Sequence, residues 1–141
     1  ESLHEPSKRL YHDPYAQHMY LGSFVQRWLG EGGTRWLYRV CGFEGILDML
    51  SIRTRWIDDE IMKVANDGKE KQQLIILGAG YDTRGFRLNV QPAFECVWEV
   101  DQTEVQTKKI RNLRQIKDDV CIQERIDSCF VRFIGIDFNQ E

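Results

Sequence analysis

The sequence predicts an α/β protein in which helices precede a parallel sheet. Three short apolar runs predict the strands, at residues 74–77, 94–100 and 130–136. Unbroken runs of this kind are typical of parallel strands that are buried on both faces. Strands that alternate with helices imply right-handed crossovers within one sheet. Because the chain stops soon after the third run, we expect the rest of the sheet to be missing from this sequence.

The composition is that of one ordinary globular domain. Of 141 residues, 42% are hydrophobic and 11% are aromatic, which is enough to bury a core. The formal net charge is only −3, whereas a general grip on nucleic acid needs a strongly basic surface. No apolar stretch approaches the ~20 residues that span a bilayer. We therefore expect neither nucleic acid nor a membrane as a partner.

The cysteines predict reduced thiols rather than a disulfide framework. They are Cys41, Cys96, Cys121 and Cys129. No two of them form a C-x-x-C pair, and no histidine lies at zinc-finger spacing from them. The chain also opens without the pattern of a secretory signal. We therefore expect a cytoplasmic protein without a metal site.

The first half of the chain is predicted to be helical. Residues 1–13 are polar and are expected to form a flexible arm before a helical cap over 14–68. The clearest helix has Ser51 as its N-cap. Its apolar stripe recurs at spacings of four and three, at Ile57, Ile61 and Val64. We expect this cap and the start of the sheet, over 74–138, to form one domain that spans 14–141.

Three further segments are expected to be helical. The spacing of large apolar residues over 14–29 is nearer helical than alternating. A second segment covers 36–50, with Gly42 and Gly45 weakening its middle. The third covers 103–115, after the second strand. Its expected apolar positions are Val105, Ile110 and Leu113.

A glycine-containing loop, Gly78-Ala79-Gly80, follows the first strand. Ligands of open α/β sheets bind at the carboxyl ends of strands, and glycine lets a ligand approach without meeting a Cβ. The dinucleotide fingerprint G-x-G-x-x-G requires a third glycine where this chain has Thr83. That difference disfavours NAD and FAD, but not a ligand without a pyrophosphate, such as S-adenosylmethionine. A plain strand-to-helix turn remains the alternative.

Acids end the second and third strands. Asp101 lies ~20 residues beyond the glycines, where a carboxylate can accept hydrogen bonds from both hydroxyls of an adenosine ribose. We expect Glu99 to face the opposite side of the strand and to orient the loop. Asp137 is placed to accept from the adenine amine, and Phe138 could contact the adenine face. For each acid, a solvated strand end remains the alternative.

Two arginines open the clearest helix. Arg53 and Arg55 could neutralise a ligand carboxylate, bidentately where the geometry permits. A solvated helix face is the alternative, and the sequence pattern alone favours it.

Three segments together resemble the leucine carboxyl methyltransferase family. They are Ser-Ile-Arg-Thr-Arg-Trp-Ile-Asp-Asp (51–59), Leu-Ile-Ile-Leu-Gly-Ala-Gly-Tyr-Asp-Thr-Arg-Gly-Phe-Arg-Leu (74–88) and Trp-Glu-Val-Asp-Gln (98–102). The middle string is specific, because general Rossmann-like methyltransferases carry only G-x-G-x-G, and here Asp82 replaces the last glycine. The family also includes bacterial O-methyltransferases and the methyltransferase module of wybutosine-synthesising proteins. The resemblance spans residues 10–140.

The resemblance implies a Rossmann-like class I methyltransferase sheet with N-terminal capping helices, truncated here after the third strand. It also implies S-adenosylmethionine as the cofactor. The residues implied to bind it are Arg53 at the methionine carboxylate, Gly78, Ala79 and Gly80 along the cofactor, Asp101 at the ribose, and Asp137 and Phe138 at the adenine. Further positions match the motif with their roles left open: Arg55, Tyr81, Asp82, Arg84 and Gln102. Arg84 and Arg87 could instead be structural, paired with acids such as Asp58 or Glu99.

The implied activity is O-methyl transfer to a carboxylate, with a protein C-terminal leucine among the candidate acceptors. A carboxylate hardly needs a catalytic base, because it is already an anion and the task is alignment of an in-line displacement. A hydroxyl acceptor would need a base, and the sequence offers no committed candidate. Two alternatives stay open. One is transfer to a small metabolite or a modified tRNA base, and the other is a non-catalytic module that pairs through an exposed sheet edge.

Overall fold

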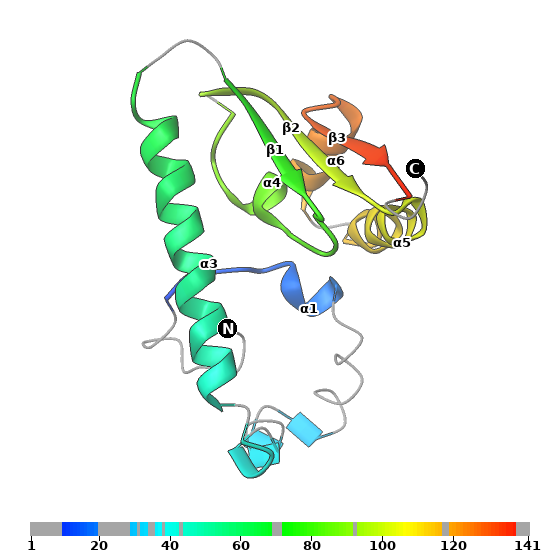
Figure 1. Cartoon of the computed structure of the whole chain (residues 1–141). Coiled ribbons are helices and arrows are strands. Elements are labelled where there is room, and N and C mark those ends of the chain that lie inside the picture. Colours follow the sequence, from blue (N-terminus) through cyan, green and yellow to red (C-terminus); the bar gives the residue numbers. More distant parts are fainter. Residues whose placement is uncertain are drawn as a thin grey trace. The chain divides into compact units, whose positions relative to one another are not determined.

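A computed structural model shows an α/β chain, which confirms the predicted fold class (Figure 1). The residues that the structure describes are 10–19, 29–30, 32–33, 36–37, 39–42, 44–68, 72–91, 93–116 and 119–137. The chain divides into two compact units, Glu1–Ile61 and Met62–Glu141. The first nine residues of the expected arm, and Phe138, lie outside the described residues. The expected grouping of cap and sheet into one domain stays a prediction.

The first unit is helical where it is described. Helix α1 (Ala16–Met19) is a single turn, and the Asp13 carboxylate caps it by accepting hydrogen bonds from the amides of Tyr15 and Ala16, both at 3.0 Å. Helix α3 (Glu44–Ala65) is much longer, at 22 residues. The bond from Cys41 N–H to the Leu37 carbonyl, at 2.9 Å, belongs to the helical turn that precedes α3.

The expected start of the clearest helix was wrong. Ser51 lies inside α3 and is 5% exposed, so it caps nothing. The break instead falls at Gly42, whose φ of +73° is a conformation that glycine adopts without strain. Gly45 does not interrupt the helix, because α3 runs without a break from Glu44 to Ala65. A Cβ at Gly45 would meet nothing within 4 Å. The predicted end is confirmed, because α3 ends at Ala65 and Gly68 follows with φ +66°.

The second unit is built on a three-stranded parallel sheet. Its strands are β1 (Gln72–Leu77), β2 (Phe94–Asp101) and β3 (Val131–Gly135), in the spatial order β1-β2-β3. The helices between them are α4 (Arg84–Arg87), α5 (Thr103–Arg114) and α6 (Val120–Asp127). Leu77 pairs with Val100, which pairs with Ile134. The carboxyl ends of all three strands therefore meet at one edge of the sheet.

The two faces of the sheet differ. Helices α4, α5 and α6 lie on one face (Figure 1), and the central strand β2 is buried on both, at Val97 and at Val100. β1 does not have the expected burial on both faces. Its residues alternate, and Ile75 and Leu77 are 59% and 74% exposed. The reason is its position, since β1 is an edge strand and the helices of this unit cover only the opposite face.

No helix in the described part of the chain combines the length and the apolar character that a membrane crossing requires.

Gly135 provides a test of the packing between β3 and α5. A Cβ added to Gly135 would overlap Thr103 Oγ1 and lie 3.2 Å from Thr103 Cβ. We expect Gly135→Ala to lower the free energy of unfolding by roughly 1–3 kcal/mol, the usual cost of overpacking. Adding Thr103→Ala should restore part of that loss. Thermal unfolding followed by circular dichroism measures both changes.

Gly45→Ala is the matched control. A Cβ there meets nothing within 4 Å, and alanine suits a helical backbone better than glycine, so this variant should lose no stability. A Gly135→Ala variant as stable as the wild type would contradict the close contact with Thr103.

Candidate functional site

The loop after β1 turns on two glycines. Gly78 and Gly80 have φ angles of +62° and +45°, in the left-handed region that side chains with a Cβ rarely adopt. A Cβ at Gly78 would meet nothing within 4 Å, so the backbone there borders open space. Between them, Ala79 is buried and its N–H donates to the Val100 carbonyl at 3.1 Å. The loop thus continues the β1–β2 hydrogen bonding before it turns.

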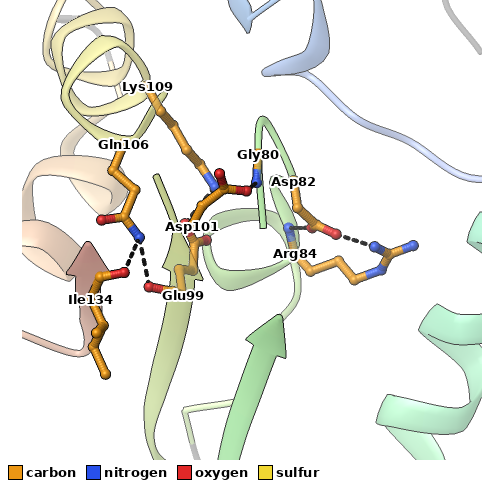
Figure 2. Close-up of polar contacts among 8 residues, drawn as sticks. All are labelled: Gly80, Asp82, Arg84, Glu99, Asp101, Gln106, Lys109 and Ile134. Atoms are coloured by element: carbon orange, nitrogen blue, oxygen red, sulfur yellow. Dashed lines mark hydrogen bonds and ion pairs between the residues drawn. The ribbon is translucent and has the colours of Figure 1, made fainter. Parts of the chain in front are cut away.

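The Asp101 carboxylate closes this loop against the end of β2 (Figure 2). The Gly80 N–H donates to Asp101 Oδ2 at 2.6 Å, and the Gln102 N–H donates to Oδ1 at 2.6 Å. Hydrogen bonds to a carboxylate are stronger than those between neutral groups. Each carboxylate oxygen can accept at two lone pairs. Each oxygen therefore keeps one lone pair with which it can accept a hydrogen bond from a ligand. Gly78, Gly80 and Asp101 are therefore brought together as predicted.

Asp82 and Arg84 stiffen the second half of the loop. Asp82 Oδ1 accepts from the Arg84 N–H at 2.8 Å, and Oδ2 forms an ion pair with Arg84 Nη1 (Figure 2). Both side chains are mostly buried. Thr83, which stands where a dinucleotide site has glycine, is 4% exposed, and its Oγ1 accepts from Arg87 Nε at 3.2 Å. Asp82 and Arg84 therefore shape the loop from within.

A buried ion pair lies behind the site. Lys109 of α5 donates to Glu99 Oε2 at 2.5 Å, and both side chains are fully buried. Gln106, one turn earlier on α5, donates through Nε2 to the carbonyls of Glu99 and Ile134, at 2.8 and 2.9 Å (Figure 2). The other carboxylate oxygen, Glu99 Oε1, has no hydrogen-bond partner. It is the one such buried side-chain nitrogen or oxygen in the described part of the chain.

This ion pair was not predicted from the sequence. The face of α5 that is buried carries Gln106, Lys109 and Leu113, whereas apolar positions were expected at Val105, Ile110 and Leu113. The available signal was the spacing, because residues 106, 109 and 113 follow the three-and-four rule and lie on one helix face. Polar side chains at two of these positions concealed the stripe.

The expectation that Glu99 and Asp101 face opposite sides was also wrong. Residues two apart in a strand share a face, and both side chains lie on the side that α4 and α5 cover. Burial raises the pKa of Glu99 to about 7, Lys109 opposes this rise, and the charges of Asp82 and Asp101 add to it. The protonation of Glu99 therefore depends on the charges of two carboxylates of the candidate site, Asp82 and Asp101.

The remaining predicted residues belong to the first unit, are exposed in the second, or lie outside the described residues. Arg53 is exposed on α3, in the first unit. Arg55 donates to both oxygens of Asp59 at 2.9 Å and to the Leu10 carbonyl at 2.7 Å, so it fixes its own helix to the preceding segment. Tyr81 is 38% exposed. Asp137 is exposed just beyond β3, and no contact of Phe138 is described.

Comparison with known sequences shows the family of this chain. A profile of the family described as leucine carboxyl methyltransferase matches residues 1–141. A protein of Mycolicibacterium smegmatis is 38% identical over 69 residues, which cover 49% of this chain and 22% of the relative. A protein of Mycobacterium avium is 45% identical over 58 residues, covering 41% and 18%. One of Frankia alni is 34% identical over 102 residues, covering 72% and 34%.

The chain belongs to the leucine carboxyl methyltransferase family. The three relatives carry names that describe S-adenosyl-L-methionine-dependent methyltransferases. The matched segments span between 18% and 34% of the length of those relatives.

The raised pKa of Glu99 predicts a pH-dependent stability. The carboxyl titrates near 4.5 when unfolded and near 7 when folded, so the folded state binds more protons between these values. The contribution of this group to the free energy of unfolding should therefore be largest below pH 4.5. It should fall by roughly 3 kcal/mol as the pH rises through 7. Urea unfolding at several pH values, compared with Glu99→Gln, isolates that contribution.

The control is Glu95→Gln, an exposed carboxyl on the same strand. It should leave the pH dependence unchanged. A difference between wild type and Glu99→Gln that stays constant from pH 4.5 to 7 would show that Glu99 titrates normally.

Proposed function

We propose that this protein binds S-adenosylmethionine at the carboxyl ends of β1 and β2 and transfers a methyl group to a carboxylate. The observation that carries the proposal is the hydrogen bond between Gly80 and Asp101, which presents an acid beside a glycine loop. Family membership and the names of the relatives support it.

The residues present fit this cofactor. Asp101 keeps lone pairs for the two ribose hydroxyls after accepting its two backbone hydrogen bonds. The open space beside Gly78 suits a ligand that lies directly against the backbone. When bound, S-adenosylmethionine would supply an electrophilic methyl group to the acceptor. The task of the chain is then to hold and orient, which a carboxylate acceptor needs more than it needs a base.

A dinucleotide fits the same loop less well. Pyrophosphates are bound at the N-terminus of a helix, where unpaired amides and the helix dipole attract the anion. α4 is only four residues long, and its N-cap residue Thr83 is buried. Two carboxylates also lie at this loop, Asp82 within it and Asp101 at the end of β2, and only Asp82 has an arginine partner in the described contacts. These features favour a ligand without phosphate groups.

The other residues of the proposed cofactor site are assigned from their match to the family motif. We assign Arg53 to the methionine carboxylate, and Asp137 and Phe138 to the adenine. Ala79, Tyr81 and Gln102 are adjoining residues along the cofactor. A protein C-terminal leucine is the acceptor that the family description suggests first. We also infer a cytoplasmic location, which is supported by the four cysteines, all of them free thiols.

Replacing Asp101 tests the cofactor site. We expect Asp101→Asn to weaken binding of S-adenosylhomocysteine by roughly 1–3 kcal/mol, or about 5- to 150-fold, because hydrogen bonds to a charged acceptor are lost. Isothermal titration calorimetry measures the affinity, with NAD as the ligand that should not bind. Asp127→Asn, at an exposed ion pair on α6, is the control and should bind normally. Equal affinities for both variants would remove Asp101 from the site.

Labelled methyl transfer tests the acceptor class. A methyl ester is hydrolysed by mild alkali and releases volatile methanol, whereas a methyl ether or methylated amine keeps its label. We expect label transferred by the protein to become volatile at alkaline pH. Alkali-stable label would instead favour a hydroxyl or amine acceptor and would leave the cofactor site intact.

A further inference from the structure

We propose that Lys109 and Gln106 of α5 are positioning residues, which hold the ligand-binding carboxylate of Asp101 in place by fixing Glu99 and the end of β2. This inference rests on the proposed role of Asp101. It concerns residues that do not themselves reach the ligand.

The link between Glu99 and the ligand-binding carboxylate is short. A single residue, Val100, separates Glu99 from Asp101 in β2, and the two side chains share a face. A shift of the backbone at Glu99 therefore moves the Asp101 carboxylate. That carboxylate accepts from the Gly80 amide at 2.6 Å, and a displacement of about 1 Å would carry the two atoms beyond hydrogen-bond distance.

Gln106 forms a bridge between two strands. Its Nε2 donates to the carbonyl of Glu99 in β2 and to that of Ile134 in β3. Both of its amide protons are used, and the side chain is only 5% exposed. One helix side chain thus fixes two neighbouring strands just before the ends that carry Asp101 and Asp137.

The buried ion pair is costly in free energy. Burying two charges costs several kcal/mol per ion before their attraction repays it, and apolar residues of similar shape often stabilise a core as well or better. Lys109 and Glu99 are fully buried, and Glu99 Oε1 has no partner among the described residues. A contribution to stability is therefore a weak explanation for this pair. A fixed, directional link between α5 and β2 explains its chemistry better.

The charges around Glu99 agree with this role. Lys109 faces it from α5, Asp82 from the loop after β1, and Asp101 from its own strand. From α4 the neighbour is Gly85, where a Cβ would lie 3.3 Å from Glu99 Oε1. Lys109 is thus the cation that holds the carboxylate against the repulsion of Asp82 and Asp101.

The test separates positioning from stability with two variants. The double variant Glu99→Gln/Lys109→Met replaces the ion pair by neutral side chains of similar shape, and Gln106→Met removes the bridge. The control is Gln123→Met, which removes a half-buried amide that donates to the Leu113 carbonyl at 3.4 Å, away from β2. Melting temperature, S-adenosylhomocysteine affinity and hydrogen exchange at the Gly80 amide are measured for each.

We expect both variants to fold cooperatively and to bind about 10- to 100-fold more weakly, the usual result of a small misplacement in a site. Exchange at the Gly80 amide should quicken by about tenfold or more, while the Val97 amide, bonded to the Phe130 carbonyl, stays protected. Gln123→Met should change neither. If one variant fails to fold, the other decides the question.

Two results would have different meanings. Folded variants with wild-type affinity and wild-type exchange at Gly80 would overturn the positioning role and leave the proposed function standing. A wild-type protein that binds no S-adenosylhomocysteine would sink the proposed function. The exchange at Gly80 would still show whether α5 holds Asp101.

Discussion

The site depends on one hydrogen bond, from the Gly80 amide to the Asp101 carboxylate. It joins the loop after β1 to the end of β2, and it needs a glycine with positive φ on one side and an acid at the strand end on the other. Parallel strands place their carboxyl ends at one edge, so the fold brings these two residues together although 21 positions separate them. Most of the local sequence pattern follows from keeping that contact.

The α5 side chains that support the end of β2 are polar, and they form directional bonds where apolar side chains could have packed. A sheet covered by α5 could have been sealed with leucines, yet the helix offers Gln106 and Lys109 to the sheet. Their bonds are directional and reach the backbone and the carboxylate of Glu99. Apolar packing lets neighbouring elements slide by small amounts, whereas short bonds to fixed acceptors do not. The chain thus accepts the cost of buried charge where a carboxylate must be held still.

The sequence predicted the parts of the fold that follow from continuous patterns. The apolar runs located all three strands, and the glycines and Asp101 at their ends located the candidate site. It failed where packing decides. The start of α3 depended on a turn at Gly42 rather than on a capping serine, and the exposure of β1 depended on its place at the edge. The short α4 and the helix α6 were not predicted, and the polar face of α5 concealed Lys109, because periodicity detects only apolar stripes.

The loop itself indicates what kind of ligand the edge of the sheet can hold. An anion site in this position would present helix amides, but Asp82 occupies the amide of Arg84 and Asp101 occupies that of Gly80. With these two donors satisfied internally, the group that this contact leaves to a ligand is the Asp101 carboxylate, which is an acceptor. Acceptors and carboxylate charge suit a ligand that brings hydroxyl donors and a positive centre. S-adenosylmethionine has both and carries no phosphate, whereas a dinucleotide would bring an anionic pyrophosphate close to this carboxylate charge.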